Sequence, residues 1–221
     1  MIYVTGDLHG DIERFRSKEM KKLKSGDTLI VCGDFGFVWD DSKKEQAILK
    51  KLGKKKYQIL FLEGTHDNLD LIEQYPLEDW GGGKVRRISG SLLKLERGNV
   101  FEIEGKKIFA FGGGESQEQE LREEDGNWWK QELPDRAEMF AAKETLAKYD
   151  HQVDYIVTHD CSPKVIHFIG IEQDKCDQLS QFFEEIGEKT IFKQWFFGCY
   201  HIDKRIPPKY TAVFEQVIPL E

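Results

Sequence analysis

The sequence lacks any apolar run long enough to form a transmembrane helix, which needs about eighteen consecutive residues. Its first residues, MIYVTGDLHG, also lack the basic stretch, apolar core and small-residue cleavage site of a signal peptide. We therefore expect no membrane partner and a cytoplasmic location. Hydrophobic residues make up 39% and charged residues 33% of the 221 positions, which is ordinary for a globular protein.

Closely spaced cysteines are missing too. The four cysteines, Cys32, Cys161, Cys176 and Cys199, are scattered, and without a secretion signal we expect reduced thiols. An excess of positive charge is also missing, because the formal net charge is −8. A broad nucleic-acid-binding surface needs clustered Lys and Arg, so the sequence gives no strong nucleic-acid signal. The one basic run, residues 50–56, is more typical of a solvated helix end.

The sequence does contain an alternation of short apolar runs and helical patterns. Five runs rich in Val, Ile and Phe are predicted to be buried strands: residues 2–4, 28–32, 57–63, 153–158 and 191–197. Helical periodicity predicts helices over residues 11–26, 42–52, 134–149 and 174–187. Residues 84–114 hold short runs broken by glycine, which suits antiparallel hairpins, and residues 210–218 are predicted to form a closing strand.

This order predicts an α/β protein with a strand-rich centre, in which two sheets pack together with helices outside. No long linker or internal repeat interrupts it, so we expect one domain over residues 1–221. Residues 112–134 are a long polar segment, and a loop of this length is often functional. Its two tryptophans, Trp128 and Trp129, either anchor the segment to the core or stack on a nucleobase, and anchoring is the commoner role.

Polar residues stand directly after each of the five predicted buried strands. They are Asp7 and His9, Asp34, His66, His159 and, after the last run, Cys199 and His201. Four of the chain's six histidines occupy these positions. Any one of them has an ordinary explanation as a turn or surface residue. Ligands of open α/β sheets bind outside the carboxyl ends of strands, so the coordinated placement favours a common site.

The residue types at these strand ends point to metal chemistry. Two aspartates and several imidazoles suit Mn, Fe or Zn better than Ca or Mg, which prefer all-oxygen ligands. A carboxylate shared between two such ions gives an arrangement that holds the attacking and leaving oxygens of a phosphoryl group. Glycine beside each ligand lets the backbone turn sharply. The pattern therefore indicates a transition-metal site suited to phosphoryl chemistry.

In this pattern the sequence resembles the calcineurin-like metallophosphoesterases. That family's blocks run D-x-H, G-D, G-N-H-D/E, a lone H and G-H-x-H. The corresponding segments here are Asp7-Leu8-His9, Gly33-Asp34, Gly64-Thr65-His66-Asp67, His159 and Gly198-Cys199-Tyr200-His201. The order is intact and spans nearly the whole chain. The resemblance implies a fold of two mixed sheets face to face, flanked by helices.

The resemblance also implies two divalent ions and hydrolysis of a phosphomonoester or phosphodiester by a metal-bridging hydroxide. The implied ligands of the first ion are Asp7, His9, Asp34 and His201. The second ion shares Asp34 and takes Thr65, His159 and Cys199. His66 is the implied catalytic residue, which stabilises the transition state or protonates the leaving oxygen. The implied substrate is a small phosphorylated molecule, with nucleotides among the candidates.

Two departures from the family pattern fall on the second ion. Thr65 stands where the family has an Asn, and its hydroxyl is a poorer neutral ligand. Cys199 stands where the family has a histidine, and a thiolate there favours Zn or Fe over Mn. A third departure is Phe37, which replaces the second Asp of the G-D-x-V-D-R-G motif of the protein phosphatases. A phosphoprotein phosphatase is therefore not expected.

The alternative function is a catalytically degenerate module that keeps the fold for binding. Thr65 and Cys199 favour it, whereas the retention of the first-ion positions and of His66 favours an enzyme, because convergent polar groups are costly to hold without chemistry. One form of the enzyme hypothesis makes Cys199 an oxidisable ligand. We expect Arg86, Arg87 and Arg122 to be exposed surface arginines.

Overall fold

A computed structural model of the protein describes residues 1–116, 118–171 and 178–221. Within this part of the chain the strands form two mixed sheets. The seven-stranded sheet has the order β13 (Ile218–Pro219), β1 (Ile2–Thr5), β2 (Thr28–Val31), β3 (Gln58–Phe61), β6 (Leu92–Leu95), β5 (Gly83–Ser89) and β4 (Leu77–Trp80). The six-stranded sheet has the order β11 (Lys204–Ile206), β12 (Tyr210–Ala212), β10 (Gln194–Phe197), β9 (Tyr155–Thr158), β8 (Lys106–Phe111) and β7 (Asn99–Ile103).

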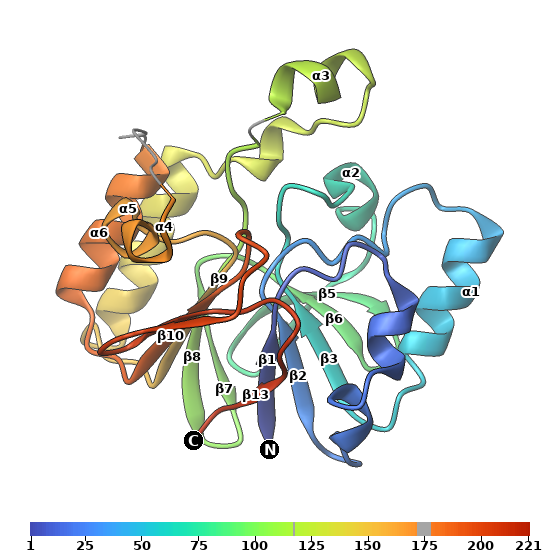
Figure 1. The fold of residues 1–221 in the computed structure, drawn as a ribbon, viewed down its shortest axis with the longest axis horizontal. Helices are drawn as coiled ribbons and strands as arrows, with labels where there is room; N and C mark the ends of the chain where they lie inside the picture. Colours follow the sequence, from blue (N-terminus) through green and yellow to red (C-terminus); the bar gives the residue numbers. More distant parts are fainter. Residues whose placement is uncertain (117, 172–177) are drawn as a thin grey trace.

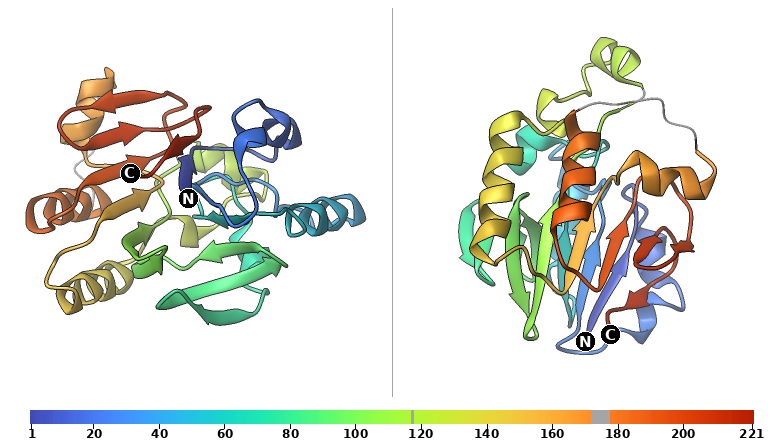
Figure 2. Two further views of the ribbon diagram at one scale, coloured as in Figure 1. Left: turned by 90° about the horizontal axis from the view of Figure 1, so that it is seen from below. Right: turned by 90° about the vertical axis from the view of Figure 1, so that its left-hand side faces the viewer.

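Helices cover the outer faces of both sheets (Figure 1; Figure 2). The α-helices are α1 (Lys43–Leu52), α2 (Leu69–Ile72), α3 (Gln119–Glu124), α4 (Arg136–Lys148), α5 (Pro163–Ile166) and α6 (Gln178–Lys189). Short 3₁₀ helices are η1 (Ile12–Arg16), η2 (Met20–Lys22), η3 (Lys130–Glu132) and η4 (His167–Ile169). Figure 1 shows α4, α5 and α6 on the side of the six-stranded sheet and α1 on the side of the seven-stranded sheet.

Three hydrophobic clusters hold these layers together. The central cluster lies between the two sheets and includes Leu60 and Phe196, which are buried. A second cluster joins the six-stranded sheet to its helices, where Phe111 packs on Phe183 of α6. The third joins the seven-stranded sheet to α1, through residues such as Leu49. Three clusters between four layers confirm the predicted sandwich of two sheets flanked by helices.

All five predicted buried strands are present, and they explain where polar residues gather. β1, β2, β3 and β6 run parallel, as do β8, β9, β10 and β12. Because parallel strands end at one edge of a sheet, the residues after β1, β2, β3, β9 and β10 are brought to the edge opposite the two chain termini (Figure 1). The strands β2 and β9 are buried at every position, as expected for strands covered on both faces.

The predicted helix over residues 11–26 is wrong. Asp11 does cap a helix, because its carboxylate accepts a hydrogen bond from the Glu13 amide at 2.9 Å, but only η1 and η2 follow. Ser17 ends η1 in an extended conformation, and its hydroxyl accepts a hydrogen bond from the Met20 amide at 3.2 Å. This local hydrogen bond competes with a continuous helix, as serine side chains often do.

Two other predictions hold only in part. Residues 210–218 form two strands, β12 and β13, in different sheets, because the Asp203 carboxylate accepts hydrogen bonds from the amides of residues 214–216 and turns the chain. The hairpin regions pair antiparallel as predicted, but β6 and β7 belong to different sheets. The predicted helix over residues 174–187 is present from Gln178 as α6, and its first four residues lie outside the described residues.

Candidate metal centre

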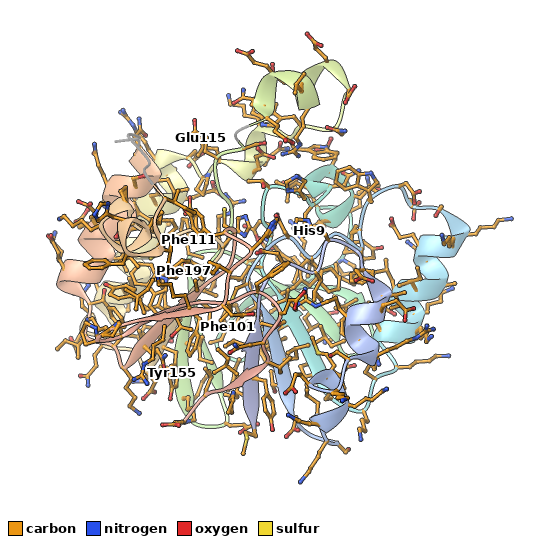
Figure 3. All side chains as sticks on the ribbon, in the orientation of Figure 1. His9, Phe101, Phe111, Glu115, Tyr155 and Phe197 are labelled. Carbon is orange, nitrogen blue, oxygen red and sulfur yellow. The ribbon has the colours of Figure 1, made fainter. Side chains whose placement is uncertain are left out.

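The side chains that follow the five strands converge at the edge shared by the two sheets. The residues brought together are Asp7 and His9 after β1, Asp34 after β2, Thr65 and His66 after β3, His159 after β9, and Cys199 and His201 after β10. Strands of both sheets contribute to the group. Figure 3 marks the place with the label of His9.

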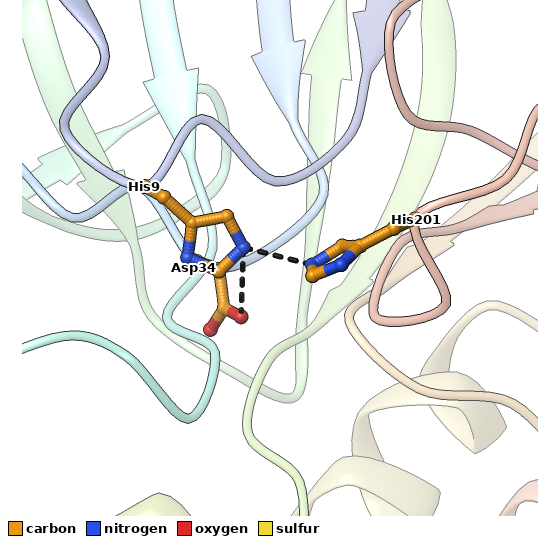
Figure 4. A group of neighbouring side chains, drawn as sticks. All are labelled: His9, Asp34 and His201. Carbon is orange, nitrogen blue, oxygen red and sulfur yellow. Dashed lines mark hydrogen bonds and ion pairs between the residues drawn. The ribbon is translucent and has the colours of Figure 1, made fainter.

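His9, Asp34 and His201 form the outer part of this cluster (Figure 4). His9 Nε2 lies 2.8 Å from His201 Nε2 and 3.7 Å from Asp34 Oδ2. One ligand atom from each of the three side chains lies within 4.8 Å of the other two. Two imidazole nitrogens and a carboxylate oxygen at this spacing are a suitable partial ligand set for a transition-metal ion.

Asp7, Asp34 and His159 form the inner part, and all three are buried. His159 Nδ1 lies 3.5 Å from Asp7 Oδ1, and His159 Nε2 lies 3.6 Å from Asp34 Oδ1. Asp34 therefore belongs to both groups, one oxygen facing each. Asp7 was expected beside His9 and His201, but its carboxylate groups with His159 and comes only to 4.0 Å of His201 Nε2.

The inner group concentrates negative charge on Asp34. Burial alone would raise the pKa of Asp34, but attraction to His159 and hydrogen bonds from His66 lower it well below its usual value. Burial raises the pKa of Asp7 to about 7, against the attraction of His159. Burial lowers the pKa of His159, yet attraction to Asp34, Cys199 and Asp7 raises it well above its usual value. A permanently charged carboxylate between two sets of ligands favours cation binding.

Buried polar atoms in the inner group fit a metal ion. Among the described residues, Asp7 Oδ2 and His159 Nε2 are buried and have no hydrogen-bond partner. Leaving such atoms unsatisfied costs about 1–3 kcal/mol each, so they usually find a ligand. A divalent cation accepts donation from both a carboxylate oxygen and an imidazole nitrogen, which makes the residues present compatible with a bound transition-metal ion.

Glycines make the room in which these side chains meet. A Cβ atom on Gly33 would lie 2.0 Å from His159 Nδ1, and one on Gly64 would lie 2.0 Å from Asp34 Oδ1. A Cβ atom on Gly198 would lie 2.6 Å from Asp7 Oδ1. Each glycine thus leaves space for a side chain that follows a different strand. This need for space restricts the position to glycine more strongly than the sharp turn predicted from the sequence.

The backbone of the cluster is held in an uncommon conformation. Eight non-glycine residues in the described part of the chain have positive φ, and four of them belong to the cluster: His9 (46°), Asp34 (43°), Cys199 (69°) and His201 (49°). Left-handed backbone costs energy for residues with a Cβ atom and tends to gather at functional sites. The folded chain therefore holds these side chains in place at a local energetic cost.

Thr65 and Cys199 lie beside the inner group rather than in it. The Thr65 hydroxyl is 3.1 Å from His66 Nδ1. The Cys199 amide donates a hydrogen bond to Asp7 Oδ1 at 3.1 Å. Burial raises the pKa of the Cys199 thiol to about 11, against the lowering effect of His159. Neither Thr65 nor Cys199 belongs to the outer or the inner group of ligand atoms, although a cysteine sulfur can be a metal ligand.

His66 is oriented by Asp34 at the open side of the cluster. Its amide donates to Asp34 Oδ1 at 2.8 Å, and its Nδ1 lies 3.1 Å from Asp34 Oδ2. The side chain remains 43% exposed, so a substrate can reach the ring. The hydrogen bond to Asp34 raises the pKa of His66, against the effect of burial. A protonated imidazole that is accessible from solvent can donate a proton to a leaving group.

Asp67 is a buried residue to which the sequence assigned no role. Its carboxylate accepts hydrogen bonds from the amides of Phe35 (3.2 Å), Gly36 (2.8 Å) and Gly64 (2.9 Å). It thereby ties the loop after β2, which carries Asp34, to the loop after β3. The only sequence signal for Asp67 was its place as the last residue of the Gly64–Asp67 block.

Asp160 and Tyr200 make a similar connection between the loops after β9 and β10. The Tyr200 hydroxyl donates a hydrogen bond to Asp160 Oδ1, which also accepts one from the Cys161 amide at 2.7 Å. Asp160 follows His159, and Tyr200 lies between Cys199 and His201. This contact fixes the separation of ligands contributed by two strands of the six-stranded sheet.

The polar segment 112–134 is not a plain loop, since it contains α3 and η3. Arg122 on α3 was expected to be exposed, and this is wrong: it is buried, with its Nη1 3.1 Å from Glu132 Oε2. Arg122 was expected at the surface because its side chain is charged, and the Glu132 carboxylate compensates that charge in the interior. Trp129 packs edge-on against Trp39, with ring centroids 5.5 Å apart, and joins the third hydrophobic cluster, which favours its anchoring role.

The family model for calcineurin-like phosphoesterases matches residues 1–189. The chain belongs to the calcineurin-like phosphoesterase family. This confirms the resemblance inferred from the five blocks and a metal-dependent phosphoesterase in general, and members of the family typically bind divalent metals. No curated protein sequence matches the chain.

One solved structure is similar in fold, and a second matches the chain more weakly. A putative 5'-nucleotidase from Staphylococcus aureus, in complex with alpha-ketoglutarate, is 14% identical with a TM-score of 0.52; the match covers 96% of this chain and 48% of the nucleotidase. The chain thus spans about half the length of that protein. The phosphopantetheinyl hydrolase of Mycobacterium tuberculosis is 13% identical with a TM-score of 0.44, over 96% of this chain and 89% of the hydrolase. The described helices include none that is long and apolar enough to span a membrane.

Proposed function

We propose that residues 1–221 form a single catalytic domain that hydrolyses a phosphomonoester or phosphodiester of a small molecule, with nucleotides among the candidate substrates. The observation that carries this proposal is Asp34, whose two carboxylate oxygens face two different groups of potential ligands. A shared carboxylate of this kind is the usual basis of a two-metal site for phosphoryl transfer.

The proposal assigns two divalent transition-metal ions, Mn, Fe or Zn, to the cluster. Residues that would hold the first are Asp7, His9, Asp34 and His201, although the Asp7 carboxylate groups with His159 and lies 4.0 Å from His201 Nε2. Residues that would hold the second are Asp34, Thr65, His159 and Cys199. The hydrogen bond from the Cys199 amide to Asp7 Oδ1, which lies 3.5 Å from His159 Nδ1, supports its inclusion, and a thiolate ligand would favour Zn or Fe. Only its position beside the inner group supports Thr65 as a ligand, because its hydroxyl pairs with His66.

Divalent ions in such a site supply a nucleophile by lowering the pKa of water and neutralise charge on the phosphoryl oxygens. The protein's own groups do the rest. Asp34 orients His66 through the contact to Nδ1, and the exposed side of the ring is then available to the leaving oxygen. The hydrogen bond to Asp34 raises the pKa of His66 and so favours the protonated ring, the form that can donate a proton to that oxygen.

The test compares His66→Ala with Asp34→Asn, and His167→Ala serves as a control because His167 is exposed and lies outside both groups. His66→Ala is expected to lower turnover of a chromogenic phosphoester by about a hundredfold or more while metal content stays unchanged. Asp34→Asn is expected to lose metal and turnover together. His167→Ala should behave as the wild type in both measurements.

The opposite outcomes are equally informative. Loss of metal in His66→Ala would make His66 a ligand instead of a proton donor. An Asp34→Asn variant that still hydrolyses a phosphodiester would contradict the two-metal assignment. If the wild type binds a single ion and turns over neither ester, the alternative of a binding module, which the departures at Thr65 and Cys199 favour, replaces the enzyme.

A further inference from the structure

The His201 ring has few polar contacts to hold it in place. His201 lies in the loop between β10 and β11, with φ at 49° and a side chain that is 51% exposed. Within the described residues, the only hydrogen bond of its ring joins Nε2 to His9 Nε2 at 2.8 Å (Figure 4). A histidine that binds a metal usually has its other nitrogen held by a carboxylate, a carbonyl or water, and no described group holds His201 Nδ1 in this way. The orientation of the ring therefore depends on packing.

Phe214 packs on the His201 ring. The two ring centroids are 4.9 Å apart and the ring planes are inclined by 30°, so the faces are closer to parallel than to perpendicular. Phe214 lies two residues after β12 and is half-buried. The His9 ring meets His201 nearly edge-on, also with centroids 4.9 Å apart and with an interplanar angle of 85°. Two aromatic rings thus limit how far the His201 ring can turn.

The Phe214 backbone is attached to both sheets. Its amide donates a hydrogen bond to Asp203 Oδ1 at 2.8 Å, and Asp203 lies two residues after His201 in the loop between β10 and β11. Its carbonyl accepts hydrogen bonds from the Gly6 amide at 3.2 Å and from the Thr5 hydroxyl at 3.0 Å. Phe214 therefore joins the loop that carries His201 to the end of β1.

Arg14 on η1 adds a further attachment. Its Nη2 donates a hydrogen bond to the Phe214 carbonyl at 2.5 Å, and its Nη1 donates one to the Asp7 carbonyl at 3.3 Å. Its Cζ lies 5.2 Å from the centroid of the Phe214 ring, which is within the range of a cation–π contact. Arg14 thus contacts both the ring and the backbone of Phe214, and it ties them to the backbone of Asp7, a proposed ligand of the same ion as His201.

We propose that Phe214 is a positioning residue of the metal centre, which stacks on His201 and orients its Nε2 atom for the first ion. Asp203 and Arg14 hold Phe214 in place for this role. The inference rests on the proposed two-metal phosphoesterase. A ring on an exposed loop would otherwise lose its freedom to rotate when it bound an ion, and holding it in position beforehand lowers that entropic cost of binding.

The test measures Zn²⁺ binding to the full chain by competition with a chromogenic chelator, under conditions that resolve two binding steps. Phe214→Leu removes the stacked ring and keeps an apolar side chain. It is expected to weaken one of the two steps by about tenfold to a hundredfold, the usual effect of losing a group that orients a ligand, and to leave the other nearly unchanged. Phe214→Tyr keeps the ring and should bind Zn²⁺ as the wild type does. Phe140→Leu is the control, because it removes an exposed phenyl ring from α4, outside the cluster.

A double substitution shows whether Phe214 acts through His201. His201→Ala alone and His201→Ala combined with Phe214→Leu are expected to bind Zn²⁺ equally, because the ring that Phe214 orients is missing from both. A further loss in the double variant as large as the loss in Phe214→Leu alone would mean a general effect on the fold, and it would overturn the inference.

The possible outcomes separate this inference from the proposed function. A wild type that binds two ions and hydrolyses an ester, together with unchanged Zn²⁺ affinity in Phe214→Leu, overturns the role of Phe214 and leaves the phosphoesterase intact. A wild type that binds no Zn²⁺ overturns the proposed function and this inference with it. An equal loss of affinity in Phe140→Leu would show an unspecific effect and would also overturn the inference.

A second measurement decides the matter if Phe214→Leu fails to fold. The ring resonances of Phe214 and His201 are identified in the wild type by their absence from the spectra of Phe214→Tyr and His201→Ala. A nuclear Overhauser effect is expected between these two rings in the Zn²⁺-loaded wild type. Its absence would show that the rings are not stacked in the loaded site, and this result overturns the proposal.

Discussion

Gly33, Gly64 and Gly198 show that the absence of a side chain shapes this site as strongly as the ligands do. Each leaves the volume in which a carboxylate or imidazole from another strand lies. Gly64 is constrained by Asp34, because a Cβ atom at Gly64 would collide with both the carboxylate and the amide nitrogen of Asp34. A substitution of Gly64 is therefore expected to change metal binding, although Gly64 is not itself a metal ligand.

Gly64→Ala is expected to lower metal affinity by at least about tenfold, because the added methyl group would lie 2.0 Å from Asp34 Oδ1 and displace that shared ligand. Metal content after dialysis measures the effect. Gly105→Ala is the control: it has φ +73° and no atom within 4 Å of the added Cβ, so it should cost about 1 kcal/mol of stability and no metal. Full metal content in Gly64→Ala would contradict the packing argument.

Sequence reasoning reached the Asp and His positions because they follow parallel strands, and parallel strands bring their ends together whatever the details of packing. It could not reach Asp67 or Arg122. The role of Asp67 depends on three amides that belong to two loops, and the burial of Arg122 depends on Glu132, ten positions further along. Such pairings arise from tertiary contacts that no local pattern encodes.

At the scale of elements, the end of β3 is fixed by buried charges. Glu63, directly before Gly64, is completely buried and accepts from Arg97 Nε at 2.5 Å, with Lys94 Nζ at 3.0 Å. Arg97 Nη2 also donates to the Gln131 carbonyl at 2.8 Å. The network therefore joins β3, β6 and the segment 112–134 beneath the site, and its loss would loosen the loops that carry the ligands.

Glu63→Gln is expected to lower the free energy of unfolding by about 3–5 kcal/mol at neutral pH, because Lys94 and Arg97 would keep buried charges without their shared anion. Burial alone would raise the pKa of Glu63, but attraction to these two cations lowers it below its usual 4.5. The stabilisation is therefore present above pH 4.5 and is lost as pH falls through the lower folded value.

Urea unfolding above and below pH 4.5 measures the difference in free energy of unfolding between the wild type and Glu63→Gln. This difference should become smaller in acid. Glu78→Gln is the control, because Glu78 pairs with Arg87 at 2.8 Å in a partly exposed contact worth about 1 kcal/mol or less. Equal stability of the two variants at neutral pH would mean that the buried network does not hold the end of β3.

Elements were harder to predict where a side chain competes with the backbone. The pattern of residues 11–26 is helical, but the Ser17 hydroxyl supplies a local hydrogen bond that ends η1. The polar composition of residues 112–134 indicated a loop, yet its chain folds into α3 and η3 around the pair of Arg122 and Glu132. Strands and well-capped helices such as α1 and α4 were predictable because their signals are local: Ser42 and Asp135 cap them as N-cap residues.

For the whole molecule, the decisive feature is that both sheets contribute to one cluster. Asp7, Asp34 and His66 follow strands of the seven-stranded sheet, whereas His159 and His201 follow strands of the six-stranded sheet. The central hydrophobic cluster sets the distance between the sheets and hence between the two sets of ligands. Metal bound at this edge would join the two halves of the sandwich, so its removal by a chelator should also lower thermal stability.

The most direct test of the account is the metal content per chain of protein purified without added metal, determined by elemental analysis. It is paired with hydrolysis of a chromogenic phosphomonoester and phosphodiester, with and without added Mn²⁺. We predict two ions per chain and turnover of at least one ester, with Cys199 and Thr65 as working variants of the second site. One ion or none, and no turnover with any supplied metal, would contradict the two-metal phosphoesterase.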